Sequence, residues 1–200
     1  QKSFFHWELE FPEVFYDEHG RRREGAGFDC VIGNPPYVRQ EQLVEIKPIL
    51  ERLYEAYEGT ADLYTYFYER SIKLLRPSGR FGMITSNKFM RARYGRPLRE
   101  FIVENTAVEK IVDFGELPVF EDASTFPAIY ILRKGRPEKQ EAVYAPIKSL
   151  DFESLEEEVR RLGRRIIDES LKPDGWTLAT EETLHLLEKI EAVGIPLGEY

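Results

Sequence analysis

The residues with the clearest chemical potential stand in one short run, Asn34-Pro35-Pro36-Tyr37, directly after an apolar stretch over 28–32. The two prolines fix consecutive φ angles and remove two backbone donors, and Asn34, which precedes a proline, is restricted to extended conformations. The side-chain oxygen of Asn34 and the rigid carbonyl of Pro35 could therefore accept both hydrogens of a planar –NH2 group. Tyr37 adds an aromatic face for stacking. This arrangement suits an enzyme that grips an amino group and methylates its nitrogen.

The chemistry explains why such acceptors are needed. The lone pair of an aromatic amino or amide nitrogen is delocalised, so the nitrogen is a poor nucleophile. Two acceptors favour a pyramidal nitrogen and stabilise the positive charge that develops during methyl transfer. Alignment with a sulfonium methyl donor then supplies much of the acceleration, with no metal and no covalent enzyme intermediate. The alternative interpretation of this run is an ordinary strand-to-loop turn, because Asn and Pro are common turn formers.

Alternating strands and helices are expected to position this loop. Residues 28–32 are short, β-rich and apolar, which predicts a strand buried inside a parallel sheet, with Cys30 in the core. Further strands are predicted over 80–85, 108–114, 128–133 and 141–145. Helices are predicted over 41–57 with a break at Pro48, over 61–75 with an apolar stripe at 63, 67, 71, 74 and 75, and over 97–105, 152–167 and 181–192. Pro77-Ser78-Gly79 is expected to end the second helix.

This order of elements predicts an α/β fold with a mostly parallel sheet and helices on both faces. Ligands of such sheets bind beyond the carboxyl ends of the strands. Asn34, Asn87 and Gly115 all fall at predicted strand ends. We therefore expect one shared site at that edge.

Composition limits the function classes. Two hundred residues suffice for one sizeable core, and no apolar run approaches the length of a membrane span, so a soluble, cytoplasmic protein is expected. The single cysteine cannot form an internal disulfide, and the three histidines are too far apart in the sequence to suggest a metal site. We therefore expect no membrane partner and no metal.

Charge gives a mixed signal about nucleic acids. The net charge of −8 argues mildly against a nucleic-acid partner. From Arg80 to Arg99, however, every charged residue is basic, and Lys88, Arg91 and Arg93 are the candidates for DNA phosphate contacts. A solvated loop is an equally good interpretation of this segment.

Several stretches in order resemble one known family, the amino-group DNA methyltransferases that use S-adenosylmethionine, specifically the adenine-N6 enzymes of the type IIG restriction–modification group. Residues 28–39 resemble the catalytic motif of that family, which has the Asn-Pro-Pro-Tyr sequence. The remaining matching stretches are residues 5–15 before that motif, 61–67 at the next helix, 75–84 at a helix end and strand, and 119–120 with 125–132 in the late motifs. The resemblance covers nearly the whole chain.

The resemblance implies roles for individual residues. Asn34 and Pro35 would accept the hydrogens of the target amino group, and Tyr37 would stack on a flipped adenine. Phe120, or alternatively Phe126, would form the opposite wall of the base pocket, although either ring could simply pack in the core. Asp29, Pro36 and Phe67 would line the site of the methyl donor, S-adenosylmethionine. For Asp29 a local hydrogen bond, and for Phe67 core packing, are the competing interpretations.

One departure from the family affects the domain organisation. The glycine-rich turn that builds much of the family's donor site does not occur before Asp29. We therefore expect residues 1–148 to form the C-terminal part of a catalytic domain. Residues 149–200 would be a helical linker toward a DNA-specificity domain elsewhere in the same parent chain, with double-stranded DNA as the partner.

Two other functions remain open at this level. The same loop serves N-methyltransferases that act on a protein glutamine or an RNA guanine. The chain could also be a non-catalytic DNA-binding or scaffold fragment, and the fragment alone is expected to be inactive even if its parent is an enzyme.

Overall fold

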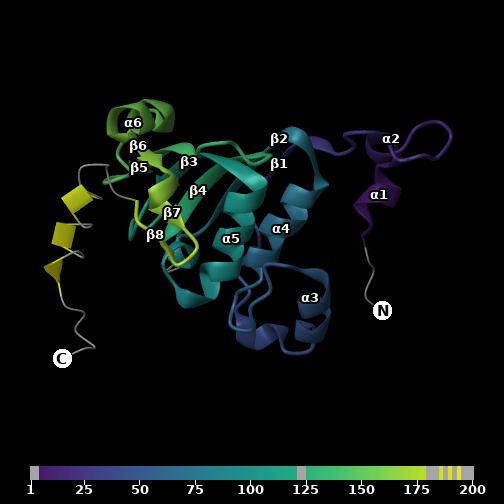
Figure 1. Cartoon of the computed structure of the whole chain (residues 1–200), viewed down its shortest axis with the longest axis horizontal. Helices are drawn as coiled ribbons and strands as arrows, with labels where there is room; N and C mark the ends of the chain where they lie inside the picture. The colour runs from purple at the N-terminus through teal and green to yellow at the C-terminus, as the bar shows by residue number, and fades with distance from the viewer. Residues whose placement is uncertain (1–4, 121–124, 179–184, 187–188, 191–192, 195–200) are drawn as a thin grey trace.

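The computed structural model describes residues 5–120, 125–178, 185–186, 189–190 and 193–194. Its centre is a six-stranded sheet with the strand order β1-β2-β4-β3-β5-β6 (Figure 1). The strands are β1 (Phe28–Gly33), β2 (Leu75–Ser86), β3 (Thr106–Asp113), β4 (Pro127–Lys134), β5 (Glu141–Pro146) and β6 (Arg164–Ile167). Strands β1, β2, β3 and β5 run in one direction, and β4 and β6 run in the opposite direction. The sheet is therefore mixed, with most strands sharing one direction.

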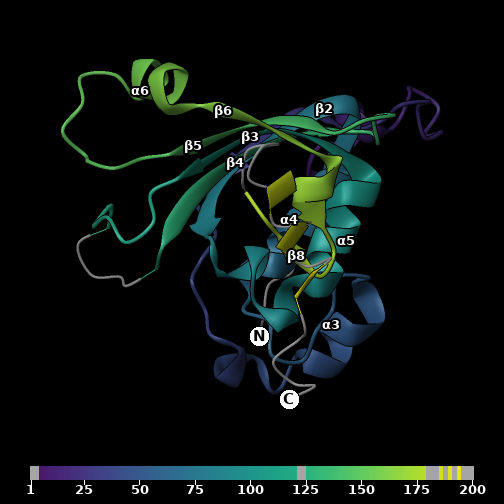
Figure 2. The same cartoon turned by 60° about the vertical axis from the view of Figure 1, so that its left-hand side comes forward.

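Helices cover both faces of this sheet. Helices α4 (Tyr64–Leu74) and α5 (Arg96–Asn105) lie side by side on one face, and α6 (Leu155–Leu162) lies on the other (Figure 2). Under α4 and α5 the core is rich in aromatic rings, with Tyr68, Phe81, Phe89 and Tyr130 buried together. Because successive strand residues point to opposite faces, Ile111 joins this core while Val112 packs toward α6. The predicted α/β fold is confirmed.

Shorter elements surround the sheet. Helices α1 (Trp7–Glu10) and α2 (Pro12–Phe15) precede β1, and η1 (Gln40–Leu43) and α3 (Lys47–Leu53) follow it. The turns η2 (Lys88–Met90) and η3 (Arg93–Gly95) lie between β2 and α5. After β6 come η4 (Asp168–Ser170) and the hairpin of β7 (Leu171–Lys172) and β8 (Gly175–Trp176). Trp176 of this hairpin is buried against Phe89, with ring centroids 5.6 Å apart.

The prediction of a buried first strand is wrong. Within the described part of the chain β1 pairs with β2 alone, so it is an edge strand. Cys30 is exposed rather than in the core, and Ile32 is 79% exposed. Apolar composition predicts burial, but it does not show whether a strand has neighbours on both sides in the sheet.

Several boundaries also differ from the predictions. The helical stretch predicted over 41–57 is divided in two near Pro48, as predicted, but both pieces are shorter: η1 ends at Leu43, and α3 spans Lys47–Leu53 with Pro48 in its first turn, where a proline loses no intrahelical hydrogen bond. Residues 75–79 fall within β2, whose register against β1 jumps from Leu75 to Arg80, so Pro77-Ser78-Gly79 forms an irregularity inside the strand. The buried face of α4 includes Tyr64, Tyr68 and Ile72, whereas Phe67 of the predicted stripe is 37% exposed.

The sequence predicts that the segment after residue 148 is helical, but in the structure it contains strands as well as a helix. The helix predicted over 152–167 ends at Leu162, and Gly163 donates its N–H to the carbonyl of Val159 at 2.8 Å. Residues 164–167 then pair with β5 as strand β6, where β-branched Ile166 is buried. This segment therefore completes the sheet of the preceding domain. Most of the helix predicted over 181–192 lies outside the described residues.

Candidate active site

The Asn34-Pro35-Pro36-Tyr37 loop begins where β1 ends, at the carboxyl edge of the sheet. Asn34 and Pro36 are exposed, whereas Pro35 is buried. Within the described residues the side chain of Asn34 has no hydrogen-bond partner, so its carboxamide is available to a ligand. The use of the Asn34 oxygen and the Pro35 carbonyl as a pair of acceptors stays a prediction.

Tyr37 connects this loop to neighbouring segments. It is half-buried, and its hydroxyl donates to the carbonyl of Ile84 in β2 over 3.5 Å, which is a weak hydrogen bond. Its ring lies edge-to-face against Phe120, with centroids 6.1 Å apart. Burial raises the pKa of the Tyr37 hydroxyl, so the ring stays neutral over the physiological range. Two aromatic side chains from distant parts of the sequence thus meet beside Asn34's loop.

The chain after Tyr37 is held by a residue that the sequence analysis did not single out. Asp62 accepts a hydrogen bond from the backbone N–H of Gln40 at 3.0 Å, and Leu63 donates to the carbonyl of Val38 at 3.0 Å. Burial raises the pKa of the Asp62 carboxyl. The Ala61-Asp62-Leu63 stretch therefore anchors the loop just ahead of α4, and only the three-dimensional contact reveals that role.

An apolar cavity of about 350 Å³ lies beside β1. Phe67 lines it from α4, and the predicted donor-site position of Phe67 therefore opens into a cavity instead of the core. The other lining residues are Trp7, Phe28, Cys30, Val31, Ile32, Arg70, Ser71 and Leu74. Asp29 is not among them: its carboxylate pairs with Arg76 at 2.6 Å, near the amino end of β1. We call this space the β1 cavity.

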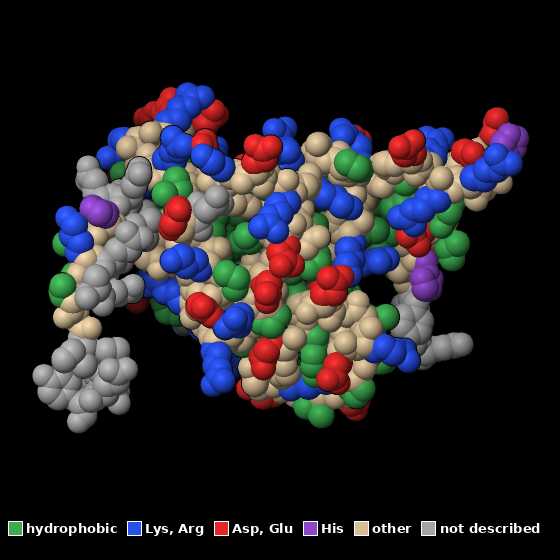
Figure 3. Space-filling view, in the orientation of Figure 1, with side chains coloured by type: hydrophobic (Ala, Val, Ile, Leu, Met, Phe, Trp, Pro, Cys, Tyr) green, Lys and Arg blue, Asp and Glu red, His purple; other side chains and the backbone are tan. Residues whose placement is uncertain are grey.

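The basic segment after β2, residues 88–99, contains two kinds of cation: exposed ones without a carboxylate partner among the described residues and ones that already form ion pairs or hydrogen bonds. Lys88, Arg91 and Arg93 are exposed and have no carboxylate partner within the described residues. Arg96 of the same segment pairs with Asp174, and Arg80, which lies within β2, pairs with Glu109. On the face drawn in Figure 3, positive and negative side chains are interspersed. The three cations predicted to contact phosphates are therefore the ones that remain available in this segment.

Arg99 explains how this segment keeps its shape. Its side chain is only 1% exposed, and its guanidinium donates to the carbonyls of Phe89, Ala92 and Pro173. Desolvation lowers the pKa of the guanidinium, but it remains charged. The buried cation thus joins the basic segment to the β7–β8 hairpin.

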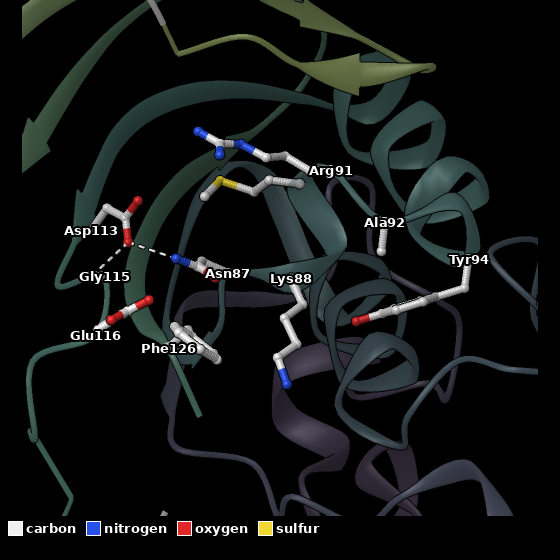
Figure 4. A pocket seen from close by; sticks show the side chains of 10 residues that line it. Asn87, Lys88, Arg91, Ala92, Tyr94, Asp113, Gly115, Glu116 and Phe126 are labelled. Atoms are coloured by element: carbon white, nitrogen blue, oxygen red, sulfur yellow. Dashed lines mark hydrogen bonds between the residues drawn. The ribbon is translucent and has the colours of Figure 1, made fainter. Parts of the chain in front are cut away.

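A second, polar cavity of about 530 Å³ lies at the ends of β2 and β3, and we call it the β2–β3 cavity (Figure 4). Asn87 and Asp113 point toward one another in it, with the amide of Asn87 donating to the carboxylate at 2.9 Å. Lys88 and Arg91 extend on either side of Asn87 (Figure 4). The remaining lining residues are Met90, Ala92, Tyr94, Gly115, Glu116 and Phe126.

Phe126 occupies an unusual position in this cavity. Its φ is +47°, a conformation that is uncommon for a bulky residue and that marks local strain. Its carbonyl accepts the N–H of Asn87 at 2.8 Å, and the ammonium of Lys88 lies 5.1 Å from its ring centroid. Phe126 therefore belongs to the β2–β3 cavity, whereas Phe120 faces Tyr37.

Within the described residues, no group of three or more His, Cys, Asp and Glu side chains is placed to hold a metal ion. Across the same residues, no helix combines the length and apolar character required to cross a bilayer.

Comparison with known proteins identifies relatives. The Eco57I restriction-modification methylase family matches residues 1–120. The type II methyltransferase M.BstVI of Geobacillus stearothermophilus is 41% identical over 129 residues, which is 62% of this chain and 23% of that protein. The type II methyltransferase M.PaeR7I of Pseudomonas aeruginosa is 32% identical over 189 residues, which is 86% of this chain and 32% of that protein. The chain thus spans a third or less of the length of these curated relatives.

Solved structures share the fold. The type IIG restriction endonuclease BpuSI matches with a TM-score of 0.55 and 18% identity, over 82% of this chain and 22% of that one. A type I restriction–modification complex matches with a TM-score of 0.56 and 14% identity, over 84% of this chain and 43% of that one. With the family match over more than half of its residues, the chain belongs to the Eco57I restriction-modification methylase family.

Proposed function

We propose that this chain is the part of a DNA adenine-N6 methyltransferase, from a restriction–modification system, that binds the target base. The observation that carries the proposal is the free carboxamide of Asn34 beside the buried Pro35, with the Tyr37 and Phe120 rings adjacent. An exocyclic amino group placed there would donate its two hydrogens to the Asn34 oxygen and the Pro35 carbonyl. The amino nitrogen would then attack the methyl carbon of a sulfonium donor as the carbon–sulfur bond breaks, leaving a neutral thioether, and the methylated nitrogen would afterwards lose a proton to solvent.

The target adenine must leave the DNA helix to reach this loop. A base stacked inside a duplex cannot present its amino group to a protein loop, so the base would flip out. Tyr37 and Phe120 would contact the flipped base, and Lys88, Arg91 and Arg93 would contact phosphates. The relatives' names support DNA modification as a class, since they are type II methyltransferases.

S-adenosylmethionine is the proposed methyl donor and supplies an electrophilic methyl group on a sulfonium sulfur. The β1 cavity fits part of this molecule: its apolar lining, including Phe67, Val31 and Ile32, suits the flat adenine ring. Among the described residues no acidic side chain lines the cavity, so contacts to the polar groups of the donor would come from elsewhere in the protein. Asp29 and Pro36 remain predicted donor-site residues, and a DNA-specificity region remains a predicted partner in the same parent chain.

The test uses the longer protein that contains this chain. It would be incubated with S-adenosylmethionine and DNA from a methylation-deficient host, and the digested DNA would be analysed for N6-methyladenosine by mass spectrometry. Asn34→Ala should lower the rate by about 100-fold or more, because one preorganised contact to the transition state is lost. Its melting temperature should stay close to that of the wild type, because Asn34 is exposed.

Other outcomes would redirect the proposal. Donor binding without N6-methyladenosine would point to an RNA or protein acceptor. Absence of donor binding would favour a non-catalytic role. A large loss of stability in Asn34→Ala with unchanged specific activity would indicate that the motif is only a turn.

A further inference from the structure

Asp113, the last residue of β3, lies at a junction that the proposed function does not use. Its Oδ1 accepts hydrogen bonds from the Asn87 amide at 2.9 Å and from the backbone N–H of Gly115 at 3.0 Å. Its Oδ2 accepts from the hydroxyl of Tyr144 in β5 at 3.0 Å. One carboxylate therefore ties together three segments that are far apart in the sequence.

Two of these segments carry residues that would contact DNA in the proposed function. Asn87 opens the basic segment that presents Lys88 and Arg91. Gly115, with φ of +55°, turns the chain out of β3 into the loop that brings Phe120 against Tyr37. Backbone contacts support the same junction, since Phe114 donates to the carbonyl of Pro127 at 3.0 Å and Ile147 donates to that of Asp113 at 2.8 Å.

The third segment supplies a fixed support. Tyr144 is buried in the sheet, and burial together with the negative charge of Asp113 raises the pKa of its hydroxyl to about 12. The hydroxyl therefore remains a donor throughout the physiological pH range. Since a carboxylate can only accept, its contact with Asn87 also fixes which end of that amide is the NH2 group. Asn87 is thus held in one orientation, with its oxygen at the opposite end.

We propose that Asp113 is a positioning residue that holds the basic segment and the Phe120 loop in register with one another. This inference rests on the proposed function for its effect on catalysis, but the coupling of the two loops can be measured independently. Asp113 would act through Asn87 and Gly115, and it would not itself touch the target base.

Kinetic measurements on the longer protein test the effect on methyl transfer. Asp113→Ala should lower kcat by about 10- to 100-fold, because a small misplacement of the groups that hold a substrate has effects of that size. The KM for DNA should change by less than about threefold, because Lys88 and Arg91 are retained. Asp113→Asn should recover to within about fivefold of the wild type, because one amide oxygen can still accept from both Asn87 and Gly115. Tyr144→Phe is the matched control, since it removes one hydrogen bond to Asp113 and leaves both loop contacts.

Amide hydrogen exchange tests the coupling itself. Asp113→Ala should speed exchange over 86–92 and over 114–120 together, while α4 keeps its wild-type protection. Unchanged exchange in either loop, equal losses across the whole sheet, or an Asp113→Asn variant as defective as Asp113→Ala would overturn the inference. If the wild-type protein methylates no adenine, the proposed function fails, and the exchange result alone then decides whether Asp113 couples the loops.

Discussion

The β1 cavity and the β2–β3 cavity are built in contrasting ways. The β1 cavity is lined mainly by apolar side chains and opens beside an edge strand that has one neighbour in the described sheet. The β2–β3 cavity is lined by Asn87, Lys88, Arg91 and Asp113, and a network of hydrogen bonds fixes its walls. The Asn34 loop follows β1, and Tyr37 reaches from it to β2.

The contrast assigns different tasks to the two sides. An apolar cavity can accept a flat aromatic group, but it gives few directional contacts. A polar cavity with fixed amide and carboxylate groups can hold a charged, hydrogen-bonding partner in one orientation. We therefore expect loss of the Phe67 ring on the β1 side to weaken donor binding, and loss of the Lys88 and Arg91 charges on the β2–β3 side to weaken DNA binding, with little effect of either change on the other affinity.

The largest effect is expected on the polar side. In the longer protein, Lys88→Ala combined with Arg91→Ala should weaken DNA binding by about 50-fold at 0.1 M salt. The slope of log affinity against log salt concentration should fall in magnitude by about 2, because fewer counterions are released from DNA when two phosphate contacts are lost. Titrations of DNA over a range of salt concentrations measure both quantities. Arg160→Ala with Arg161→Ala on α6 removes the same charge and is the control. Equal weakening by both double variants would mean that only net charge matters.

An intermediate effect is expected on the apolar side. Phe67→Ala should raise the Kd for S-adenosylmethionine by about tenfold, because an aromatic contact in the β1 cavity is lost. DNA affinity should stay unchanged. Calorimetry with the donor and the DNA titration above separate the two effects, and Leu53→Ala, an exposed apolar change on α3, serves as control. A loss of DNA affinity without a loss of donor affinity would reverse the assignment of the cavities.

The smallest effect is expected at the edge strand. Cys30→Ser in the 200-residue chain should change the free energy of unfolding by less than about 0.5 kcal/mol, because the side chain is exposed. Leu132→Ala, at a fully buried position in β4, should cost about 2–5 kcal/mol. Denaturant titrations of the two variants make the comparison. A cost for Cys30→Ser similar to that of Leu132→Ala would show that β1 is covered.

Local patterns were sufficient to predict much of the fold. Strand-then-loop order placed Asn34 correctly, and the helix over 97–105 agrees with α5 to within one residue. The direction of β4 was not predictable. This strand lies between β2 and β3 and runs antiparallel to both, and the apolar pattern of a strand is the same in either direction. Arg164-Arg165-Ile166-Ile167 could be read as the end of an amphipathic helix, and only pairing with β5 makes it a strand.

The candidate site was predictable to a different degree. The family resemblance assigns Tyr37 and Phe120 to opposite walls of a base pocket, and that role stays a prediction; in the structure the two rings lie edge-to-face with centroids 6.1 Å apart. Asp113 and Asp62 were missed, because a single aspartate at a strand or helix end carries no distinctive sequence signal. Their roles arise from sheet register and loop packing, which bring Asn87, Gly115 and Tyr144 to one carboxylate.

The buried guanidinium of Arg99 has a consequence for how such proteins can exchange parts during evolution. Two of its carbonyl partners precede it in the sequence, and the third, Pro173, follows it by 74 residues. A recombination junction between Arg99 and Pro173 would pair this cation with a foreign hairpin, and an unsatisfied buried donor costs about 1–3 kcal/mol or more. Leu178 is buried in the same core as Trp176, so junctions that join new downstream regions to this fold should be tolerated best after Leu178.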